Sequence, residues 1–226
     1  FVYYRPHHLV LTSLEFDHAD IFRDLGEIET WFRRLVNMIP SNGNIVYSSA
    51  YDNLRDIVSK SLSKRFSYGK AGADFSYNAA GYSGDFSNLD ITAPGGHFPL
   101  KTRLFGEFNF DNCMAAVAMA RLLGIEEESI RAGLESFQGV KRRQELIYDR
   151  NRVRVYDDFA HHPTAIKYVL DTMRERYPKA RLWALYEPRS ATSRRNVFQE
   201  VLPESFRAAD AILIKTPYEG STIKDG

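Results

Sequence analysis

The hydrophobic and polar positions of this chain follow two periods in turn, and their alternation predicts an α/β fold. Short apolar or alternating runs predict strands, whereas apolar residues at every third or fourth position predict helices. The predicted strands cover residues 9–11, 45–47, 152–156, 181–186 and 211–214. The predicted helices include residues 28–35, 54–62, 112–123, 130–137, 163–176 and 195–206. Strands that alternate with helices favour parallel sheets flanked by helices.

Residues 65–104 depart from this alternation. Their short aromatic runs, separated by many Gly, Ser and Asn residues, are typical of small antiparallel strands and loops. Gly124 is expected to end the helix that begins at Asn112. Residues 138–143 are expected to form a hinge, so the sequence predicts two domains, 1–137 and 138–226.

Composition and charge exclude several classes of protein. The chain has 226 residues, 44% hydrophobic, with 30 basic and 29 acidic side chains and a net charge of +1. This balance gives no field that would attract nucleic acid or an anionic membrane. No apolar run is long enough for membrane insertion, and we expect no signal peptide. A single cysteine, Cys113, excludes an internal disulfide and favours a cytoplasmic location. The first residue, Phe1, is not Met, so we expect a fragment.

The candidate chemistry is concentrated where the predicted strand 152–156 gives way to the helix 163–176. This segment reads Asp157-Asp158-Phe159-Ala160-His161-His162-Pro163-Thr164. Ligands of open α/β sheets bind at the carboxyl ends of strands, and four ionisable groups there need partners such as phosphate, metal or each other. One of the two aspartates is alternatively expected to be the helix N-cap. A lone histidine is usually a packed or solvated ring.

Three further groups lie near predicted strand or helix ends. Glu15, Asp17 and His18 follow the strand 9–11 and suit a divalent metal, although a charged loop that caps the next helix explains them equally well. Asn109 and Asn112 would share a helical face, where a side-chain amide can hydrogen-bond to the donor and acceptor edge of adenine. The alternative is that one of them is the N-cap of the helix. The run 141–143, Lys-Arg-Arg, can hold phosphate or form a solvated surface.

Taken together, these motifs resemble the Mur ligases, ATP-dependent enzymes that build the peptidoglycan precursor. The resemblance covers most of the chain and rests on four motifs in order: 12–18, Gly106-x-x-Asn109-x-x-Asn112-x-x-Ala115-Ala116, Phe137-x-Gly139-x-x-Arg142-Arg143-x-Glu145 and 157–164. It implies a partial central ATPase domain and a partial Rossmann-like C-terminal domain. The family's phosphate loop, Gly-x-x-Gly-Lys-Thr/Ser, is not found in this sequence.

The resemblance also implies a reaction and roles for individual residues. Mur ligases transfer the γ-phosphate of ATP to a carboxylate, and an amine then displaces phosphate from the acyl phosphate. Glu15 and His18 would hold Mg²⁺, and Asn109 and Asn112 would contact adenine. Arg143 would contact phosphate, Asp158 the ribose, and His161 would lie nearest the reacting phosphate.

Within the family, the 157–164 motif points to the branch that acts on UDP-N-acetylmuramate. Residues 14–22 and Glu187-Pro188-Arg189-Ser190 resemble the murein peptide ligases. Those enzymes add the tripeptide L-alanyl-γ-D-glutamyl-meso-diaminopimelate during peptidoglycan recycling, and Arg189 would contact this substrate. Three alternatives stay open: an L-alanine-adding ligase, a folylpolyglutamate synthase and a non-catalytic nucleotide-binding relative. The oligomeric state is left open.

Overall fold

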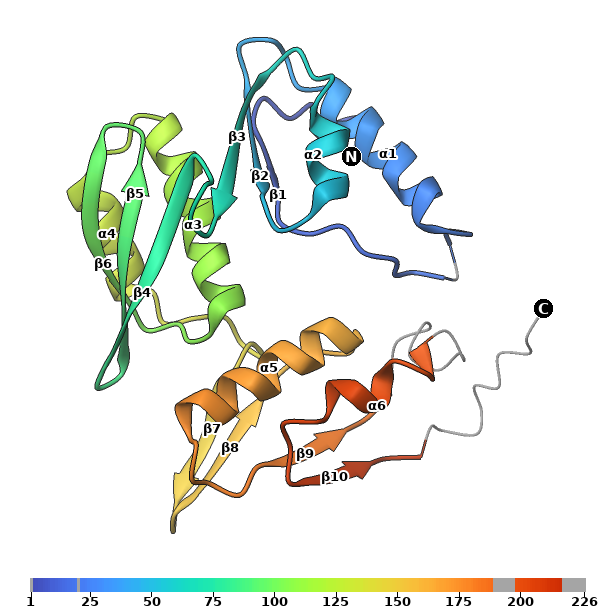
Figure 1. Ribbon diagram of the computed structural model, residues 1–226, viewed down its shortest axis with the longest axis vertical. Coiled ribbons are helices and arrows are strands. Elements are labelled where there is room, and N and C mark those ends of the chain that lie inside the picture. Colours follow the sequence, from blue (N-terminus) through green and yellow to red (C-terminus); the bar gives the residue numbers. More distant parts are fainter. Residues whose placement is uncertain (1, 20, 189–197, 217–226) are drawn as a thin grey trace. The chain divides into compact units, whose positions relative to one another are not determined.

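The computed structural model describes residues 2–19, 21–188 and 198–216. The chain divides into two compact units (Figure 1). The first consists of residues 1–16 and 24–138, and the second of 17–23 and 139–226. The sequence placed a boundary between residues 137 and 138; the structure divides after Gln138 and groups 17–23 with the later residues.

The first unit is a six-stranded sheet with four α-helices. The strands follow one another in chain order: β1 (Leu9–Leu11), β2 (Asn44–Ser48), β3 (Lys64–Gly69), β4 (Phe75–Ser83), β5 (Phe86–Ala93) and β6 (Gly96–Thr102). The strands β1 to β4 pair in parallel, whereas β5 and β6 add antiparallel strands. The helices are α1 (Leu25–Asn37), α2 (Asp52–Val58), α3 (Glu107–Leu122) and α4 (Glu127–Ser136). A short 3-10 helix, η1 (Val2–Tyr4), precedes β1.

The antiparallel prediction for residues 65–104 is confirmed for β5 and β6 but is wrong for β3. That strand pairs in parallel with β2, with Val46 opposite Phe66. The sequence of β3, Lys-Arg-Phe-Ser-Tyr-Gly, contains polar residues like those of an edge strand. In the structure, however, β3 pairs with a parallel strand on each side. The α/β class with a mainly parallel sheet and flanking helices is confirmed.

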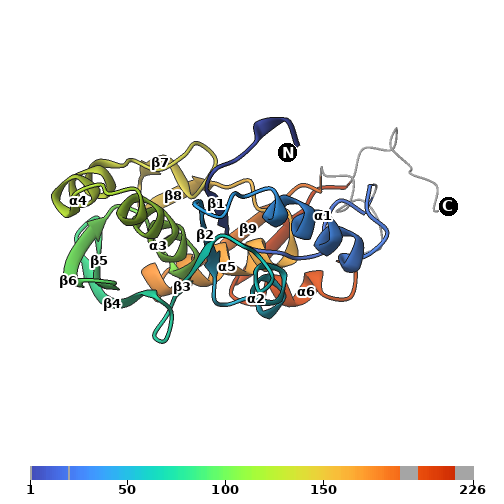
Figure 2. The same cartoon turned by 90° about the horizontal axis from the view of Figure 1, so that it is seen from above.

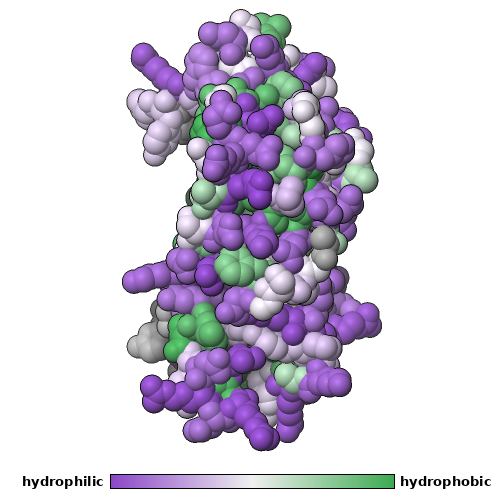
Figure 3. Space-filling view, turned by 90° about the vertical axis from the view of Figure 1, so that its left-hand side faces the viewer, coloured by the Kyte–Doolittle hydropathy of each residue, from purple (hydrophilic) through white to green (hydrophobic). Residues whose placement is uncertain are grey.

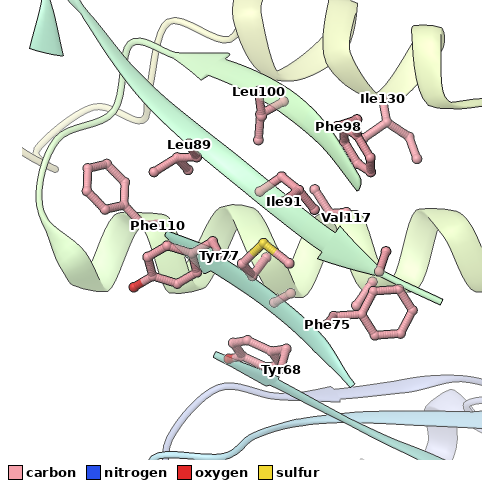
Figure 4. Packing of buried hydrophobic residues seen from close by; sticks show 14 of the residues in the cluster. Tyr68, Phe75, Tyr77, Leu89, Ile91, Phe98, Leu100, Phe110, Val117 and Ile130 are labelled. Atoms are coloured by element: carbon pink, nitrogen blue, oxygen red, sulfur yellow. The ribbon is translucent and has the colours of Figure 1, made fainter. Parts of the chain in front are cut away.

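The core of the first unit lies between the sheet and α3. Tyr77, Leu89, Ile91, Phe98 and Leu100 point from β4, β5 and β6 toward Phe110 and Val117 of α3 (Figure 4). Both α3 and α4 cover the same face of these three strands (Figure 2). Alternate residues of a strand face one side of a sheet, so the apolar sides of β4 to β6 can close against a single helical layer.

Helix α3 begins at Glu107, five residues before the predicted start at Asn112. Its N-cap is Gly106, whose φ of 87° suits a residue without a side chain. The predicted end is confirmed: the helix stops at Leu122, and Gly124 has a φ of 79°. The amides of Gly124 and Ile125 donate to the carbonyls of Arg121 and Ala120, both at 3.0 Å, which closes the last turn.

The second unit contains two small sheets and the helix α5 (Pro163–Arg176), which has the predicted bounds. An antiparallel hairpin is formed by β7 (Glu145–Arg150) and β8 (Val153–Asp157); β7 was not predicted. Strands β9 (Trp183–Tyr186) and β10 (Ala211–Ile214) pair in parallel. The prediction of a helix over 195–206 is too long for the described part: α6 covers Leu202–Ser205, and residues 195–197 lie outside the described residues.

A small core joins the elements of the second unit. It consists of Ile166 and Leu170 from α5, Ala184 and Tyr186 from β9, and Phe206, which follows α6. On the face drawn in Figure 3, hydrophilic side chains predominate and the hydrophobic ones form small separate groups. No helix among the described residues has the length and apolar character needed to cross a membrane.

Candidate functional site

The segment after β1 is held by the beginning of α2. The side-chain amide of Asn53 donates to the Leu14 carbonyl at 3.1 Å, and Leu14 itself is buried. The hydroxyl of Tyr51 donates to Oε1 of Glu15 at 3.1 Å. A hydrogen bond from a second residue is a common way to orient a carboxylate that binds a metal. These two contacts fix Glu15 at the carboxyl end of β1, where the fold places ligands.

His18 lies three residues further on, in a different environment. Its side chain is 66% exposed, and its backbone has a φ of 55°, with the amide donating to Oδ1 of Asp17 at 2.7 Å. Glu15 belongs to the first unit and His18 to the second. Among the described residues, no three His, Cys, Asp or Glu side chains gather in a way that could hold a metal. Mg²⁺ often takes only one or two carboxylates and completes its shell with water and phosphate, so a carboxylate and an imidazole are donors of a suitable kind, and the metal role of Glu15 and His18 stays a prediction.

The two asparagines lie in the first two turns of α3, on the shared helix that the prediction required. Asn109 is half-buried, and its amide donates to the Phe105 carbonyl at 2.8 Å. Asn112 is exposed. The alternative role as N-cap is wrong for both residues, because Gly106 is the cap and has no side chain.

A polar cluster at the same end of α3 was missed by sequence reasoning. The Tyr77 hydroxyl of β4 donates to Oδ1 of Asp111 at 3.1 Å, and Lys70 pairs with Glu107 at 2.6 Å. Burial raises the pKa of Asp111 to about 6, and the hydrogen bond from Tyr77 opposes that rise. Burial, followed by the charge of Asp111, raises the pKa of Tyr77 and also that of Tyr68. The sequence signal for this cluster was the pair of acidic residues Glu107 and Asp111, which are four positions apart and lie beside the two asparagines.

In the second unit, the loop before β7 is fastened to the segment after β8. The two carboxylate oxygens of Asp158 accept hydrogen bonds from the backbone amides of Ala160 at 2.7 Å and Gln144 at 2.8 Å. The amide of Phe159 donates to the Arg142 carbonyl at 2.8 Å. Asp158 therefore organises the junction of the two loops, a role that the sequence did not reveal.

Arginine and aromatic side chains cover this junction. The guanidinium carbons of Arg142 and Arg143 lie 5.0 and 5.6 Å from the centre of the Phe159 ring, within the range of cation–π attraction. Arg142 also pairs with Asp157 at 3.5 Å. Arg143 is exposed, so its guanidinium is accessible to an anion in solvent.

The two histidines of the 157–164 motif have different surroundings. His162 is the N-cap of α5, and its Nδ1 accepts a hydrogen bond from the Thr164 amide at 3.3 Å. The expectation that an aspartate caps this helix is therefore wrong, because Asp158 bonds to other amides. His161 has Nδ1 3.1 Å from the Phe159 carbonyl, and its Nε2 lies 3.8 Å from Oδ2 of Asp17. This contact joins Asp17, from the end of the 12–18 motif, to the 157–164 motif within the second unit.

Arg189 lies outside the described residues. Nearby, Glu187 follows β9 and pairs with Lys215, which follows β10, at 2.7 Å. These side chains lie at the carboxyl ends of two neighbouring parallel strands. Glu187 thus has a charged partner among the described residues, and the role of Arg189 stays a prediction.

Curated relatives cover nearly all of this chain. It is 36% identical over 220 residues to the UDP-N-acetylmuramate–L-alanyl-γ-D-glutamyl-meso-2,6-diaminoheptandioate ligase of Escherichia coli K12, covering 96% of this chain and 48% of the relative. It is 30% identical over 220 residues to the UDP-N-acetylmuramate–L-alanine ligase of Clostridium tetani, with the same coverage of 96% and 48%. The chain therefore spans about half the length of the curated relatives it matches.

Solved structures and family profiles agree with these relatives. A murein peptide ligase from Psychrobacter arcticus is 34% identical, with a TM-score of 0.65, over 94% of this chain and 44% of that one. MurF from Thermotoga maritima, solved with ADP, shares the fold with a TM-score of 0.77 at 20% identity, over 92% of this chain and 48% of that one. The Mur ligase middle domain matches residues 2–120, and the Mur ligase glutamate ligase domain matches residues 142–225. The chain therefore belongs to the Mur ligase family.

Proposed function

We propose that this chain is part of an ATP-dependent ligase that joins L-alanyl-γ-D-glutamyl-meso-diaminopimelate to UDP-N-acetylmuramate. The observation that carries the proposal is the organised junction at 157–162, where Asp158 fastens the arginine loop and His161 contacts Asp17. The 36% identical relative is named for this reaction. Residues 1–137 would belong to the central ATP-binding domain and 138–226 to the C-terminal ligase domain. We also propose a cytoplasmic enzyme of peptidoglycan recycling.

The proposed reaction forms an amide from a carboxylate that does not react with amines unaided. The γ-phosphate of ATP moves to the muramoyl carboxylate, and the tripeptide amine attacks the acyl carbon, expelling phosphate and losing a proton. Phosphoryl transfer depends mainly on positioning and on stabilising the charge that spreads over the phosphate oxygens. Mg²⁺ held by Glu15 and His18 would supply part of that stabilisation.

The chain's own residues would supply the rest. Asn109 and Asn112 would bind adenine through their amides, and the exposed Arg143 guanidinium would bind phosphate bidentately. Asp158 has both oxygens engaged with backbone amides, but each carboxylate oxygen has a second lone pair that can accept a ribose hydroxyl. His161, next to Asp17, would lie near the transferring phosphate.

A second candidate is the L-alanine-adding reaction, because relatives named for it are 30% and 33% identical to this chain. Phosphate release by the full-length protein, with UDP-N-acetylmuramate, ATP and each amine in turn, tests both. We expect far faster turnover with the tripeptide than with L-alanine. We also expect Arg189→Ala to cost more with the tripeptide, since that substrate has more carboxylates for a guanidinium to hold.

The outcomes separate the candidates. Faster turnover with L-alanine rejects the tripeptide assignment and favours the L-alanine-adding reaction. If the protein binds nucleotide but releases no phosphate with either amine substrate, it is a non-catalytic relative. In that case, the full-length sequence should also contain no Gly-x-x-Gly-Lys-Thr/Ser segment before Phe1.

A further inference from the structure

The beginning of α3 is attached to the sheet through one buried tyrosine. The Tyr77 side chain is 4% exposed, and its ring packs edge-on against Phe110 at 6.0 Å between centroids. Its hydroxyl donates to Oδ1 of Asp111 at 3.1 Å and also lies 3.4 Å from the Glu107 carbonyl oxygen. One hydroxyl thus contacts two successive turns of α3, the first through the backbone and the second through a carboxylate.

A second attachment lies on the same stretch of helix. Lys70, directly after β3, pairs with Glu107, the first residue of α3, at 2.6 Å. The groups that face Asp111 are therefore Tyr77 from β4, Tyr68 from β3, Glu107 on its own helix and Lys70. An ionised carboxylate accepts a stronger hydrogen bond than a neutral side chain does, so the Tyr77 contact holds α3 most firmly when Asp111 is charged.

The proposed adenine ligands lie on the same two turns. Asn109 is two residues before Asp111 and Asn112 is one residue after it. One residue corresponds to about 100° of rotation around a helix. Asp111 contacts the sheet while Asn112 is exposed, so the rotation of this helix end decides where the Asn112 amide points.

We propose that Asp111 and Tyr77 are positioning residues for the nucleotide, because their hydrogen bond sets the rotation of the first turns of α3 and with it the direction of Asn109 and Asn112. This inference rests on the proposed function, since it requires that those asparagines bind adenine. The contact acts through the helix and not on the reacting atoms. It should therefore govern the affinity for ATP and leave the chemical step largely unchanged.

The test uses the full-length protein with Tyr77→Phe and Asp111→Asn, which keep the size of each side chain. A fluorescent ATP analogue gives Kd, and phosphate release gives KM for ATP and kcat. We expect Kd and KM to rise roughly 3- to 10-fold in both variants, the scale of a typical net hydrogen bond, with kcat within about twofold. Asp90→Asn, an exposed aspartate on β5, is the matched control and should keep the wild-type Kd.

A pH series adds a readout that a purely structural role would not change. The pKa of Asp111 is raised to about 6, so lowering the pH from 7.5 to 5.5 converts the charged acceptor to the neutral acid. ATP affinity should fall over this range more in the wild type than in Asp111→Asn. The titration of the nucleotide's own phosphate is common to both proteins and cancels in the comparison.

Asn112→Ala distinguishes the positioning role of Tyr77 and Asp111 from the proposed contact between Asn112 and adenine. If Asn112→Ala weakens ATP binding but Tyr77→Phe and Asp111→Asn do not, the positioning role is wrong and the proposed function stands. If the wild type binds no ATP, the proposed function and this inference both fail. Should Asp111→Asn not fold, Tyr77→Phe still decides, because it removes a single hydroxyl from an otherwise unchanged ring.

Discussion

At the residue scale, Asp111 links the stability of the first unit to pH. Burial raises its pKa to about 6, whereas an unfolded chain leaves an aspartate near 4. The folded state therefore binds this proton more tightly than the unfolded state. Its contribution to stability is full below the unfolded pKa, is lost as the pH rises through about 6, and is absent at neutral pH.

Because ionisation of Asp111 lowers the stability of the folded state, Asp111→Asn should change the thermal stability in a direction that depends on pH. At pH 7.5 the variant should melt a few degrees higher than the wild type, because a neutral amide is not penalised for being buried. The gain should shrink as the pH is lowered toward 5, where the wild-type carboxyl becomes neutral. Calorimetric Tm values over that pH range provide the measurement. A lower Tm at every pH would mean that the charged form is net stabilising.

His18 provides a second prediction at this scale. Its side chain is 66% exposed, so His18→Ala should change Tm very little, since exposed substitutions are usually within about 0.5 kcal/mol. The ligation rate should fall steeply, because a metal ligand organises the phosphates. Both quantities are measured on the same preparation, with Mn²⁺ binding as a third readout. A large loss of Tm with an unchanged rate per folded molecule would make His18 structural.

At the scale of the elements, the turn between α1 and β2 depends on a residue without a side chain. The amide of Gly43 donates to the Pro40 carbonyl at 2.8 Å, and its carbonyl accepts from Lys64 at 3.2 Å. A Cβ at this position would lie 2.1 Å from the His7 carbonyl oxygen and 2.8 Å from Ile39. Backbone crowding therefore explains the glycine in this turn.

Gly43→Ala should therefore lower the free energy of unfolding by about 1–3 kcal/mol, the usual cost of overpacking. The first strand pair, β1 with β2, would have to move to admit the methyl group. Gly133→Ala in α4 is the matched control, because a Cβ there meets nothing within 4 Å. That change should raise the free energy of unfolding by about 1 kcal/mol through helix propensity. Denaturant titration of both variants checks the opposite signs; a neutral Gly43→Ala would contradict the crowding.

At the scale of the whole molecule, each unit has a hydrophobic core of its own. In the second unit, Arg174 of α5 donates to the carbonyls of Ala180 at 2.8 Å and Ala208 at 3.0 Å, and pairs with Asp210 at 2.7 Å. Asp210 also accepts from the Leu182 amide at 2.7 Å. One side chain thus joins the helix to the beginnings of both parallel strands.

Arg174→Ala should weaken the second unit selectively, since it removes the guanidinium donor from two carbonyls and from the Asp210 carboxylate. Hydrogen exchange should show faster exchange in β9 and β10 and unchanged protection in β4 to β6. Arg207→Ala is the control, because Arg207 and Glu204 form a highly exposed pair at 3.3 Å, and such pairs contribute little. Equal loss of protection in both units would show that their cores unfold together.

The features that the sequence predicted correctly are local. Helix α5 has the predicted bounds because Pro163 suits a first helical turn and the apolar residues from Ile166 to Met173 repeat at helical spacing. Gly124 marks the end of α3 because a left-handed conformation favours glycine. The ordered motifs predicted the family, since each is a short string of residues that can be read without knowing its neighbours in space.

The tertiary structure alone decided the features that depend on residues far apart. One such feature is the parallel pairing of β3 with β2. Two others are the hydrogen bond between Gln144 and Asp158, 14 positions apart, and the one between Tyr77 and Asp111, 34 positions apart. Periodicity reports which face of an element is apolar, but not which partner covers it. That choice depends on packing and on hydrogen bonds that form only when the separate segments meet. Here burial by those segments raises the pKa of Asp111, and hydrogen bonds between distant residues fix the 157–162 junction.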